Sequence, residues 1–367
     1  MPESTMIAST RERLPMLDVL RGIAAVGVVM FHLPGTPLTM QRMYLLVDLF
    51  FILSGFVMSL SAEPLLASGL RVSSFMQARL RRVWPLMALG VLLNTAVFLT
   101  EDSFANVLPL TVLGLMMVPV LTADVLVYPI NGPQWSLVWE LAANAAHGLV
   151  LRRLSDRALL WLALAGGAGV IWADQRAGCG CAGGDAMNWA LGAPRVLWSY
   201  TIGMWMARQW RNGTHRAVLP WQVVLAAVPL ALMGLPFVPL STASGDMAMT
   251  LVVLPLLFWA ACACRTPDRL PRVLTGLGAM SFPLYATHPA VLHLFAAARG
   301  HWPMQIAALM SALSLAALIA GRRRIVANIR RWRSAQGQAH MLGFQPQQVD
   351  DGAADVGGGV GLLHHHA

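Results

Sequence analysis

The chain contains no lysine, so arginine supplies all 26 of its basic residues. Charged residues of both signs are scarce, since they make up 12% of the 367 residues, about half the share found in soluble domains. Hydrophobic residues reach 57%, and the mean hydropathy is +0.60. This composition excludes an ordinary soluble enzyme and predicts a polytopic membrane protein, with the lipid bilayer as a partner.

The net charge of +9 does not indicate a nucleic-acid partner. The arginines stand in short connections between apolar segments, where the positive-inside rule of membrane topology already accounts for them. We therefore expect no binding of nucleic acid.

The apolar segments lack the strict alternation that is typical of outer-membrane barrels, and many approach the roughly 20 residues that cross a bilayer as a helix. We predict an all-α fold, a polytopic transmembrane helical bundle of about ten spans with one re-entrant or surface segment. The expected spans are 17–34, 44–61, 84–101, 136–151, 158–173, 190–207, 220–237, 247–264, 273–294 and 302–320.

With the N-terminus in the cytoplasm, this arrangement places most of the arginines on the inner side. The inner arginines are Arg71, Arg79, Arg81, Arg82, Arg152, Arg153, Arg157, Arg208, Arg211, Arg216, Arg265, Arg269, Arg272, Arg322, Arg323 and Arg324; Arg42, Arg176 and Arg299 fall outside. The apolar stretch 109–121 is interpreted as the re-entrant or surface segment, because a full span there would move Arg152 and Arg153 to the outer side. The prediction is a multi-pass protein with both termini cytoplasmic.

The chain organisation follows from these spans. Residues 1–16 form a polar cytoplasmic segment, 17–321 form the transmembrane domain, and 322–367 form a tail that is first basic and then, after Arg333, predicted to be disordered. No cleavable signal peptide is expected, because the first apolar segment carries Asp18, Arg21 and His32. No connection is long enough for a soluble catalytic domain, so any chemistry is expected within the membrane body.

The chain has only four cysteines. Cys179 and Cys181 lie in a predicted outer loop, where a disulfide to each other or to a partner would be stable. Cys262 and Cys264 are expected to be small buried apolar residues. The spacing of one intervening residue in each pair does not suit zinc, and we predict no metal site.

Ionisable residues within the predicted spans indicate a functional site, because such side chains are costly in a bilayer. Arg21 and His32 are eleven residues apart, so they share one face of a helix about 16 Å apart along its axis. Asp18 stands three residues before Arg21 and is expected to pair with it.

Other polar residues need partners inside the same body. Asp48 has apolar neighbours on both sides and requires a cation or hydrogen-bond donor, for which Arg21 or His32 is the expected choice. Glu140 lies about one turn inside its span, while Trp135 fits an interfacial anchor. His288 ends the ninth span at the outer side, as His32 ends the first. For each of these residues taken alone, a structural role is the simpler interpretation. Their presence together in one small membrane body favours a functional site.

Five motifs follow one another along the chain: LDVLRGIAAVGVVMFH, VDLFFILSGFVMS, RLRRVWP, PQWSLVWE and SFPLYATHPAV. In their order and spacing they resemble the acyltransferase 3 family of bacterial integral membrane proteins. The resemblance extends from about residue 17 to 321. It implies transfer of an acyl group, often acetyl, to extracytoplasmic carbohydrates and related acceptors, from the inner (cytoplasmic) membrane of a bacterium.

The family's motifs fall on particular residues of this chain. They are Arg21 and His32; Phe50, Phe51, Leu53, Ser54, Gly55 and Phe56; Arg79, Arg82 and Pro85, with Trp84 before the proline; Trp135, Ser136, Leu137 and Glu140; and Ser281, Tyr285 and His288. Family members often carry an additional soluble esterase-like domain, which this sequence does not show. The acceptor would then be modified at the membrane body or through a separate periplasmic partner protein.

The resemblance implies cytosolic acyl-CoA as the donor substrate, most often acetyl-CoA, and no permanently bound cofactor. The phosphates of acyl-CoA need cations, and the expected donor-binding residues are Arg21, Arg79 and Arg82. Arg81 is interpreted as a charge that only sets the membrane topology. The supporting residues are Asp18, Ser54, Trp135, Ser136, Tyr285 and His288.

Transfer to a hydroxyl requires a base, and histidine has a suitable pKa near neutrality. We predict His32 as the catalytic residue, with Asp48 or Glu140 orienting or charging it. It could act as general base or carry the acyl group transiently, and the sequence does not separate these mechanisms. The alternative function is a transporter or export partner for a carbohydrate or lipid, although no inverted repeat is evident.

Overall fold

The computed structural model describes residues 14–122, 126–213, 219–264, 271–296 and 302–341. Within these ranges the chain is mainly helical and has no β-strand, although an isolated bridge joins Leu126 to Asp185, and this confirms the all-α prediction. The chain divides into two compact units, residues 1–320 and 321–367. Every site described below lies in the first unit.

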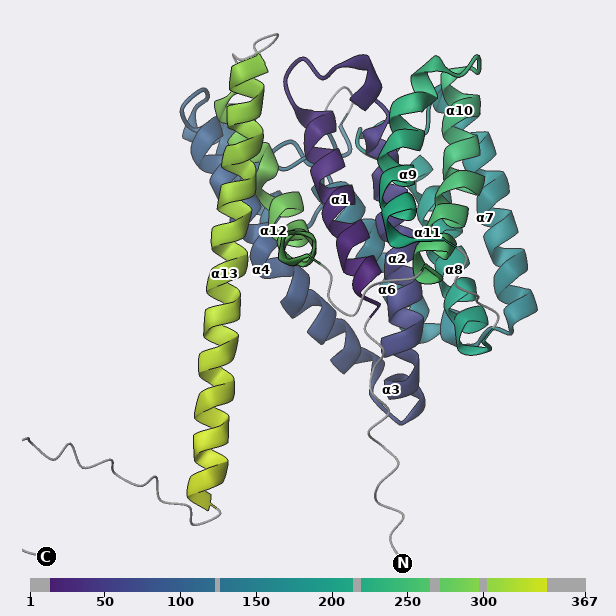
Figure 1. Cartoon of the computed structure of the whole chain (residues 1–367). Helices are drawn as coiled ribbons and strands as arrows, with labels where there is room; N and C mark the ends of the chain where they lie inside the picture. Colours follow the sequence, from purple (N-terminus) through teal and green to yellow (C-terminus); the bar gives the residue numbers. More distant parts are fainter. Residues whose placement is uncertain (1–13, 123–125, 214–218, 265–270, 297–301, 342–367) are drawn as a thin grey trace, which may run out of the picture. The chain divides into compact units, whose positions relative to one another are not determined.

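The described helices are labelled in Figure 1, where α1, α2, α7 and α9 run nearly along one common direction. Their bounds are α1 (Pro15–His32), α2 (Leu46–Ser61), α3 (Glu63–Ala67), α4 (Val72–Phe98), α5 (Phe104–Leu115), α6 (Gln134–Leu149), α7 (Asp156–Ala177), α8 (Gly192–Arg211), α9 (Trp221–Gly234), α10 (Thr242–Ala248), α11 (Leu254–Cys262), α12 (Arg272–Leu294) and α13 (Trp302–Met341). A π-helical segment, Met249–Val253, joins α10 to α11.

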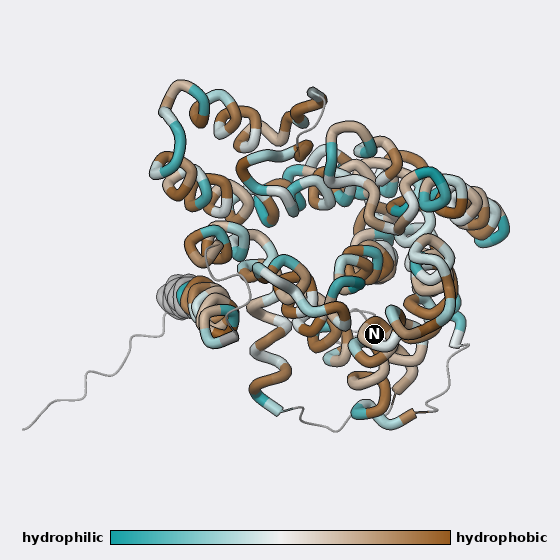
Figure 2. Tube along the Cα trace, turned by 90° about the horizontal axis from the view of Figure 1, so that it is seen from above, coloured by the Kyte–Doolittle hydropathy of each residue, from teal (hydrophilic) through white to brown (hydrophobic). Residues whose placement is uncertain are grey.

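The fold is that of a membrane protein, as the composition predicts. Five helical segments of the described chain are long and apolar enough to cross a bilayer: Pro15–His32, Leu38–Ser61, Asp156–Ala177, Thr242–Cys262 and Pro303–Arg322. Two further apolar helices, Phe104–Leu115 and Trp221–Phe237, are shorter. The number of ten spans therefore remains a prediction. Figure 2 shows that hydrophobic positions dominate most helices and are interrupted by single hydrophilic ones.

The stretch 109–121 does not form a long helix. Helix α5 covers only 12 residues, whereas about 20 are needed to cross the hydrocarbon core as a helix. Its length is consistent with the re-entrant or surface segment expected from the sequence, and the helix begins five residues earlier than the stretch, at Phe104.

Two predicted boundaries are wrong. Helix α4 begins at Val72 rather than at residue 84, so Arg79 and Arg82 lie on a helix and not in a connecting loop. The criterion of apolar length missed these turns because they are polar, although Ala, Arg, Gln and Leu all favour helix. Helix α13 continues to Met341, so residues 334–341 are helical where disorder was predicted.

Some predictions concern residues that the structure does not describe. The first 13 residues of the N-terminal segment and the final 26 of the tail, 342–367, lie outside the described ranges. The same holds for Arg216, Arg265, Arg269 and Arg299.

Local sequence explains where α1 starts and stops. Pro15 occupies its first turn, where the missing N–H removes no hydrogen bond of the helix. Leu33 precedes Pro34 and adopts extended backbone, with φ −61° and ψ 138°, because a residue before proline avoids the helical conformation. His32 is therefore held at the last position of α1.

Close contact between α2 and α8 depends on two glycines. A Cβ atom on Gly55 would lie 2.0 Å from the Tyr200 carbonyl oxygen, and one on Gly203 would lie 2.1 Å from that of Ile52. Each helix thus rests against the other's backbone, as small residues allow in membrane helix pairs. This packing fixes α2, which contributes Val47, Phe50 and Ser54 to the site.

Candidate active site

A cationic cavity of about 110 Å³ lies among α1, α2, α4, α6 and α12, and we call it the basic cavity. Arg21, Arg79 and Arg82 line it, together with the carboxylate Glu140. The other polar side chains in its wall are Ser54, Ser136, Ser281 and Tyr285. The structure thus brings together the three arginines that the sequence assigned to donor binding.

Positive charge exceeds negative charge in this cavity. Glu140 Oε1 accepts a hydrogen bond from Arg79 Nη2 at 3.0 Å and another from Ser54 Oγ at 2.7 Å. Arg21 pairs with Asp18 at 3.3 Å, which confirms the predicted contact along one helix. In the described part of the chain Arg82 has no carboxylate partner, and the buried Nε of Arg79 has no acceptor. The cavity is therefore suited to an anion.

A larger cavity of about 590 Å³ contains His32, and we call it the histidine cavity. Its wall combines aromatic and polar side chains. The aromatic ones are Phe31, Tyr44, Phe98, Trp135 and Tyr285, and the polar ones include His32, Asn94, Asp185, Arg195 and His293. Aromatic surfaces interspersed with hydrogen-bonding groups are usual in pockets that hold organic ligands.

The hydrogen bonding of His32 leaves one ring nitrogen available. Nδ1 lies 2.8 Å from the carbonyl oxygen of Val28, which can only accept, so Nδ1 carries the hydrogen. Nε2 then has a free lone pair, as a base or nucleophile requires. His288 is buried behind His32, with the two ring centroids 5.0 Å apart, and its Nδ1 likewise contacts the Tyr285 carbonyl oxygen at 3.0 Å.

The two cavities are lined by successive segments of the same helices. On α1 the basic cavity is lined by Arg21 and the histidine cavity by His32. On α12, Ser281 and His293 show the same division. The order is reversed on α2, where Ser54 lines the basic cavity and Tyr44, just before its start, lines the histidine cavity.

The cavities meet at two side chains, Val47 and Tyr285, which line both. The hydroxyl of Tyr285 lies 2.6 Å from that of Ser136 and donates to the Pro133 carbonyl oxygen at 3.3 Å. Three motifs separated in the sequence, around residues 50, 136 and 285, therefore converge at the boundary. His32 and Arg21 are on either side of it.

The predicted partner of Asp48 is wrong. Its carboxylate is buried and accepts from Arg195 Nη2 at 2.7 Å and from Nε at 3.3 Å, with no ion pair to Arg21 or His32. Helix α8 carries Arg195 to this point through its close contact with α2. Asp48 therefore orients Arg195, which itself lines the histidine cavity.

The carboxylate of Glu140 does not contact His32, which the sequence had offered as its partner. Its hydrogen bonds go to Arg79 and Ser54 at the other cavity. The side chains that surround His32 are instead His288 and Phe31, whose ring centroid is 4.8 Å away.

Trp135 packs against residues inside the protein, whereas the sequence suggested an anchor at the membrane interface. Its ring lies 5.5 Å from the Arg195 guanidinium carbon and 6.4 Å from the Phe51 ring centroid. The indole thus covers the Asp48–Arg195 pair and forms part of the histidine cavity wall.

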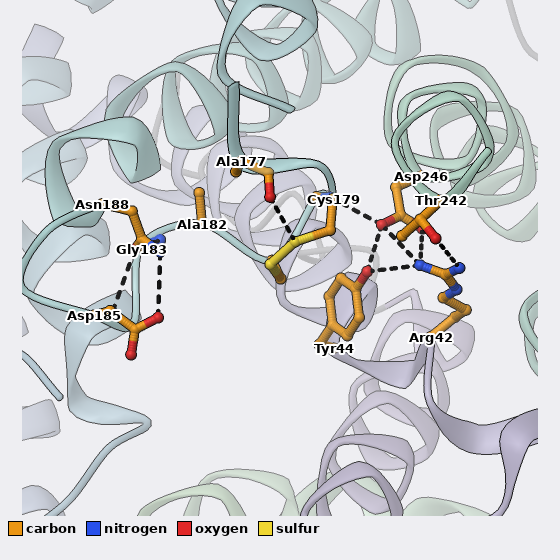
Figure 3. The surroundings of a disulfide bond; sticks show 12 residues. Arg42, Tyr44, Ala177, Cys179, Ala182, Gly183, Asp185, Asn188, Thr242 and Asp246 are labelled. Carbon is orange, nitrogen blue, oxygen red and sulfur yellow. Dashed lines mark hydrogen bonds and ion pairs between the residues drawn. A yellow bond between two sulfur atoms is a disulfide. The ribbon is translucent and has the colours of Figure 1, made fainter. Parts of the chain in front are cut away.

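A loop that contains a disulfide contributes Cys181, Gly184 and Asp185 to the wall of the histidine cavity. Figure 3 shows the disulfide and the residues around it. Cys179 and Cys181 are bonded to each other, which is one of the two pairings expected from the sequence. The backbone N–H of Gly180 donates to Asp246 at 2.8 Å, and Asp246 also accepts from Tyr44 and Arg42. Cys262 is buried, as predicted, and Cys264 is half-buried.

Sequence reasoning missed Arg195 and Asp246, both of which are buried. Arg195 lies inside the predicted span 190–207, so the rule that singled out Arg21 would have found it. Asp246 stood just outside the predicted span 247–264, and only the position of α10 beside Tyr44 reveals its burial.

The described chain is helical, and one set of its helices lines both the basic cavity and the histidine cavity, as expected of a membrane protein with a polar interior site. The sequence model of the Acyl_transf_3 family, described as an acyltransferase domain, matches residues 14–321. The chain belongs to this acyltransferase 3 family and is an acyltransferase.

One curated relative is "Protein 2 in picA locus" of Rhizobium radiobacter. It is 32% identical to this chain over 168 residues, which cover 39% of this chain and 84% of the relative. No solved structure matches the chain.

Proposed function

We propose that the protein moves an acyl group, most often acetyl, from cytosolic acyl-CoA to a hydroxyl of an extracytoplasmic carbohydrate or glycolipid. The observation that carries this proposal is the meeting of the basic cavity and the histidine cavity at Val47 and Tyr285. Donor and acceptor can enter from opposite ends and come into contact at this boundary.

The basic cavity suits the donor. Phosphate groups pair well with arginine, and here Arg82 and the Nε of Arg79 lack a carboxylate or acceptor. Arg21 lies on the same wall, and its exposed pair with Asp18 offers little competition to a phosphate. Glu140 and Ser54 hold Arg79 in position.

The histidine cavity suits the acceptor. The Nε2 of His32 takes the proton of the acceptor hydroxyl, whose oxygen then attacks the thioester carbonyl carbon. The carbon–sulfur bond breaks, the ester bond forms, and the proton ends on the thiol of CoA. In the second form of the mechanism His32 Nε2 attacks first and carries the acyl group to the hydroxyl.

We also propose the inner bacterial membrane as the location, with both termini in the cytoplasm and the basic cavity opening toward it. A separate periplasmic protein is a candidate partner for acceptor handoff. Transport of a carbohydrate or lipid is the rival function, because two cavities along one axis also fit a permeation path.

The deciding experiment uses purified full-length protein with acetyl-CoA and an envelope glycan extract from a strain that lacks the gene. An acyltransferase releases CoA and adds an acyl mass to a glycan, which mass spectrometry detects. His32→Ala should retain the folded elution profile and lose both signals. Normal acyl transfer by His32→Ala would contradict its role, and movement of glycan across vesicles without acyl change would favour the transporter.

The same preparation separates the two forms of the mechanism. A quenched reaction with labelled acetyl-CoA and no acceptor should leave label on a His32 peptide if the histidine carries the acyl group. Absence of label, combined with acceptor-dependent CoA release, supports the general base.

A further inference from the structure

Val47 and Tyr285 form the partition between the two cavities, since both side chains line each of them. Both are buried, with 6% and 5% of their surface exposed. They approach from α2 and α12, so the opening between them depends on the volume of these two side chains.

Neither side of the partition moves aside easily. Valine in a helix is restricted to one strongly preferred rotamer. The hydroxyl of Tyr285 is tied to Ser136 at 2.6 Å, and its ring packs against Phe50 with centroids 5.5 Å apart. Because protein interiors are close-packed, a long chain cannot pass without displacing one of these groups.

We infer that Val47 and Tyr285 limit the transferred group to a short acyl chain. The inference rests on the proposed function, in which the thioester comes from the basic cavity and the hydroxyl from the histidine cavity. The reacting carbonyl carbon must then reach the partition, and the rest of the acyl chain must fit beside Val47. A two-carbon acyl group places one methyl there, whereas each further methylene needs additional space.

Val47 gives the cleaner test, because it makes no hydrogen bond and its substitution changes volume alone. Val47→Ala enlarges the opening, and Val47→Leu narrows it. Val228→Ala is the matched control: Val228 is a fully buried valine on α9 that lines neither cavity. It reports the effect of removing the same two methyl groups elsewhere in the core.

The experiment measures kcat/KM for acetyl-, butyryl- and hexanoyl-CoA by CoA release, with the full-length protein and the glycan extract as acceptor. We expect the wild type and Val228→Ala to prefer acetyl-CoA strongly. In Val47→Ala the ratio of kcat/KM for hexanoyl-CoA to kcat/KM for acetyl-CoA should rise about tenfold or more, which is the usual effect of one or two methylene groups in an apolar pocket. Val47→Leu should lower the butyryl to acetyl ratio.

The outcomes separate the inference from the function on which it rests. If the wild type consumes acetyl-CoA and Val47→Ala keeps the wild-type chain-length ratios, the partition does not select the acyl group and the inference is overturned. If the wild type consumes no acyl-CoA of any length, the proposed function fails and the inference fails with it. Should Val47→Ala not fold, the change in ratio for Val47→Leu decides the question.

Discussion

Arg195 and Asp48 form a buried ion pair across 147 residues of sequence, with Nη2 2.7 Å from Oδ2 and at most 2% of either side chain exposed. Arg195 also donates to the Ala182 carbonyl oxygen at 2.6 Å, in the loop that follows the disulfide. One guanidinium therefore connects α2, α8 and the wall of the histidine cavity.

Removing Asp48 should destabilise the protein strongly. Asp48→Ala leaves Arg195 buried without its carboxylate, a change that typically costs about 3–5 kcal/mol. Thermal unfolding in detergent should show a large fall in midpoint, whereas Asp18→Ala, which breaks an exposed pair, should cost less than about 1 kcal/mol. The double variant Asp48→Leu/Arg195→Met should recover much of the loss. Unchanged stability with lost turnover would instead assign Asp48 a direct role in the chemistry.

Neutralising Arg82 should weaken binding of the donor. Arg82→Gln removes a cation that has no carboxylate partner among the described residues, and we expect KM for acetyl-CoA to rise about tenfold or more. The adjacent Arg81→Gln is the control, because Arg81 does not line the basic cavity. Equal effects of the two variants would mean that net charge, and not the cavity, attracts the donor.

Filling the contact between α2 and α8 should also destabilise the fold. Gly55→Ala places a methyl group 2.0 Å from the Tyr200 carbonyl oxygen, and such overpacking costs about 1–3 kcal/mol or more. Gly234→Ala, at a helical glycine with open space around it, should be neutral or stabilising by up to about 1 kcal/mol. Unfolding midpoints of the two variants in the same detergent test this, and equal midpoints would contradict the close packing.

Reducing the disulfide should lower the stability of the protein only slightly and should weaken acceptor binding more clearly. Cys179 and Cys181 close a loop of only three residues, so the entropic stabilisation is about 1.6 kcal/mol. The double variant Cys179→Ser/Cys181→Ser should raise KM for the acceptor, because Cys181 lines the histidine cavity. A reductant should reproduce the effect in the wild type and leave the double variant unchanged. An effect on the double variant would point to another target.

The local features of the site were predictable from the sequence. Asp18 and Arg21 pair because three residues nearly complete one helical turn. The three arginines that the motifs assigned to donor binding line one cavity, which agrees with their grouping in the sequence prediction. The start of α4 was not predictable from hydropathy, because its first turns are polar and only helix propensity supports them.

The partners of Asp48 and Glu140 could not be read from the sequence. Several arginines and histidines in the predicted spans were possible partners. The actual partner depends on which helices pack together and on which turns of those helices are in contact. Gly55 and Gly203 bring α2 against α8, so Asp48 meets Arg195 rather than His32. The same holds for Glu140, which contacts Arg79 of α4.

The sequence alone determined the class of this protein. Its scarcity of charge and its apolar helical segments predict a membrane protein, because composition and helical periodicity act within a few turns of chain. The acyltransferase activity follows from the resemblance of its ordered motifs to the acyltransferase 3 family. Only the tertiary structure decided that the basic and histidine cavities meet at Val47 and Tyr285. That meeting depends on the direction and contact height of antiparallel helices, which side-chain packing over long sequence separations sets.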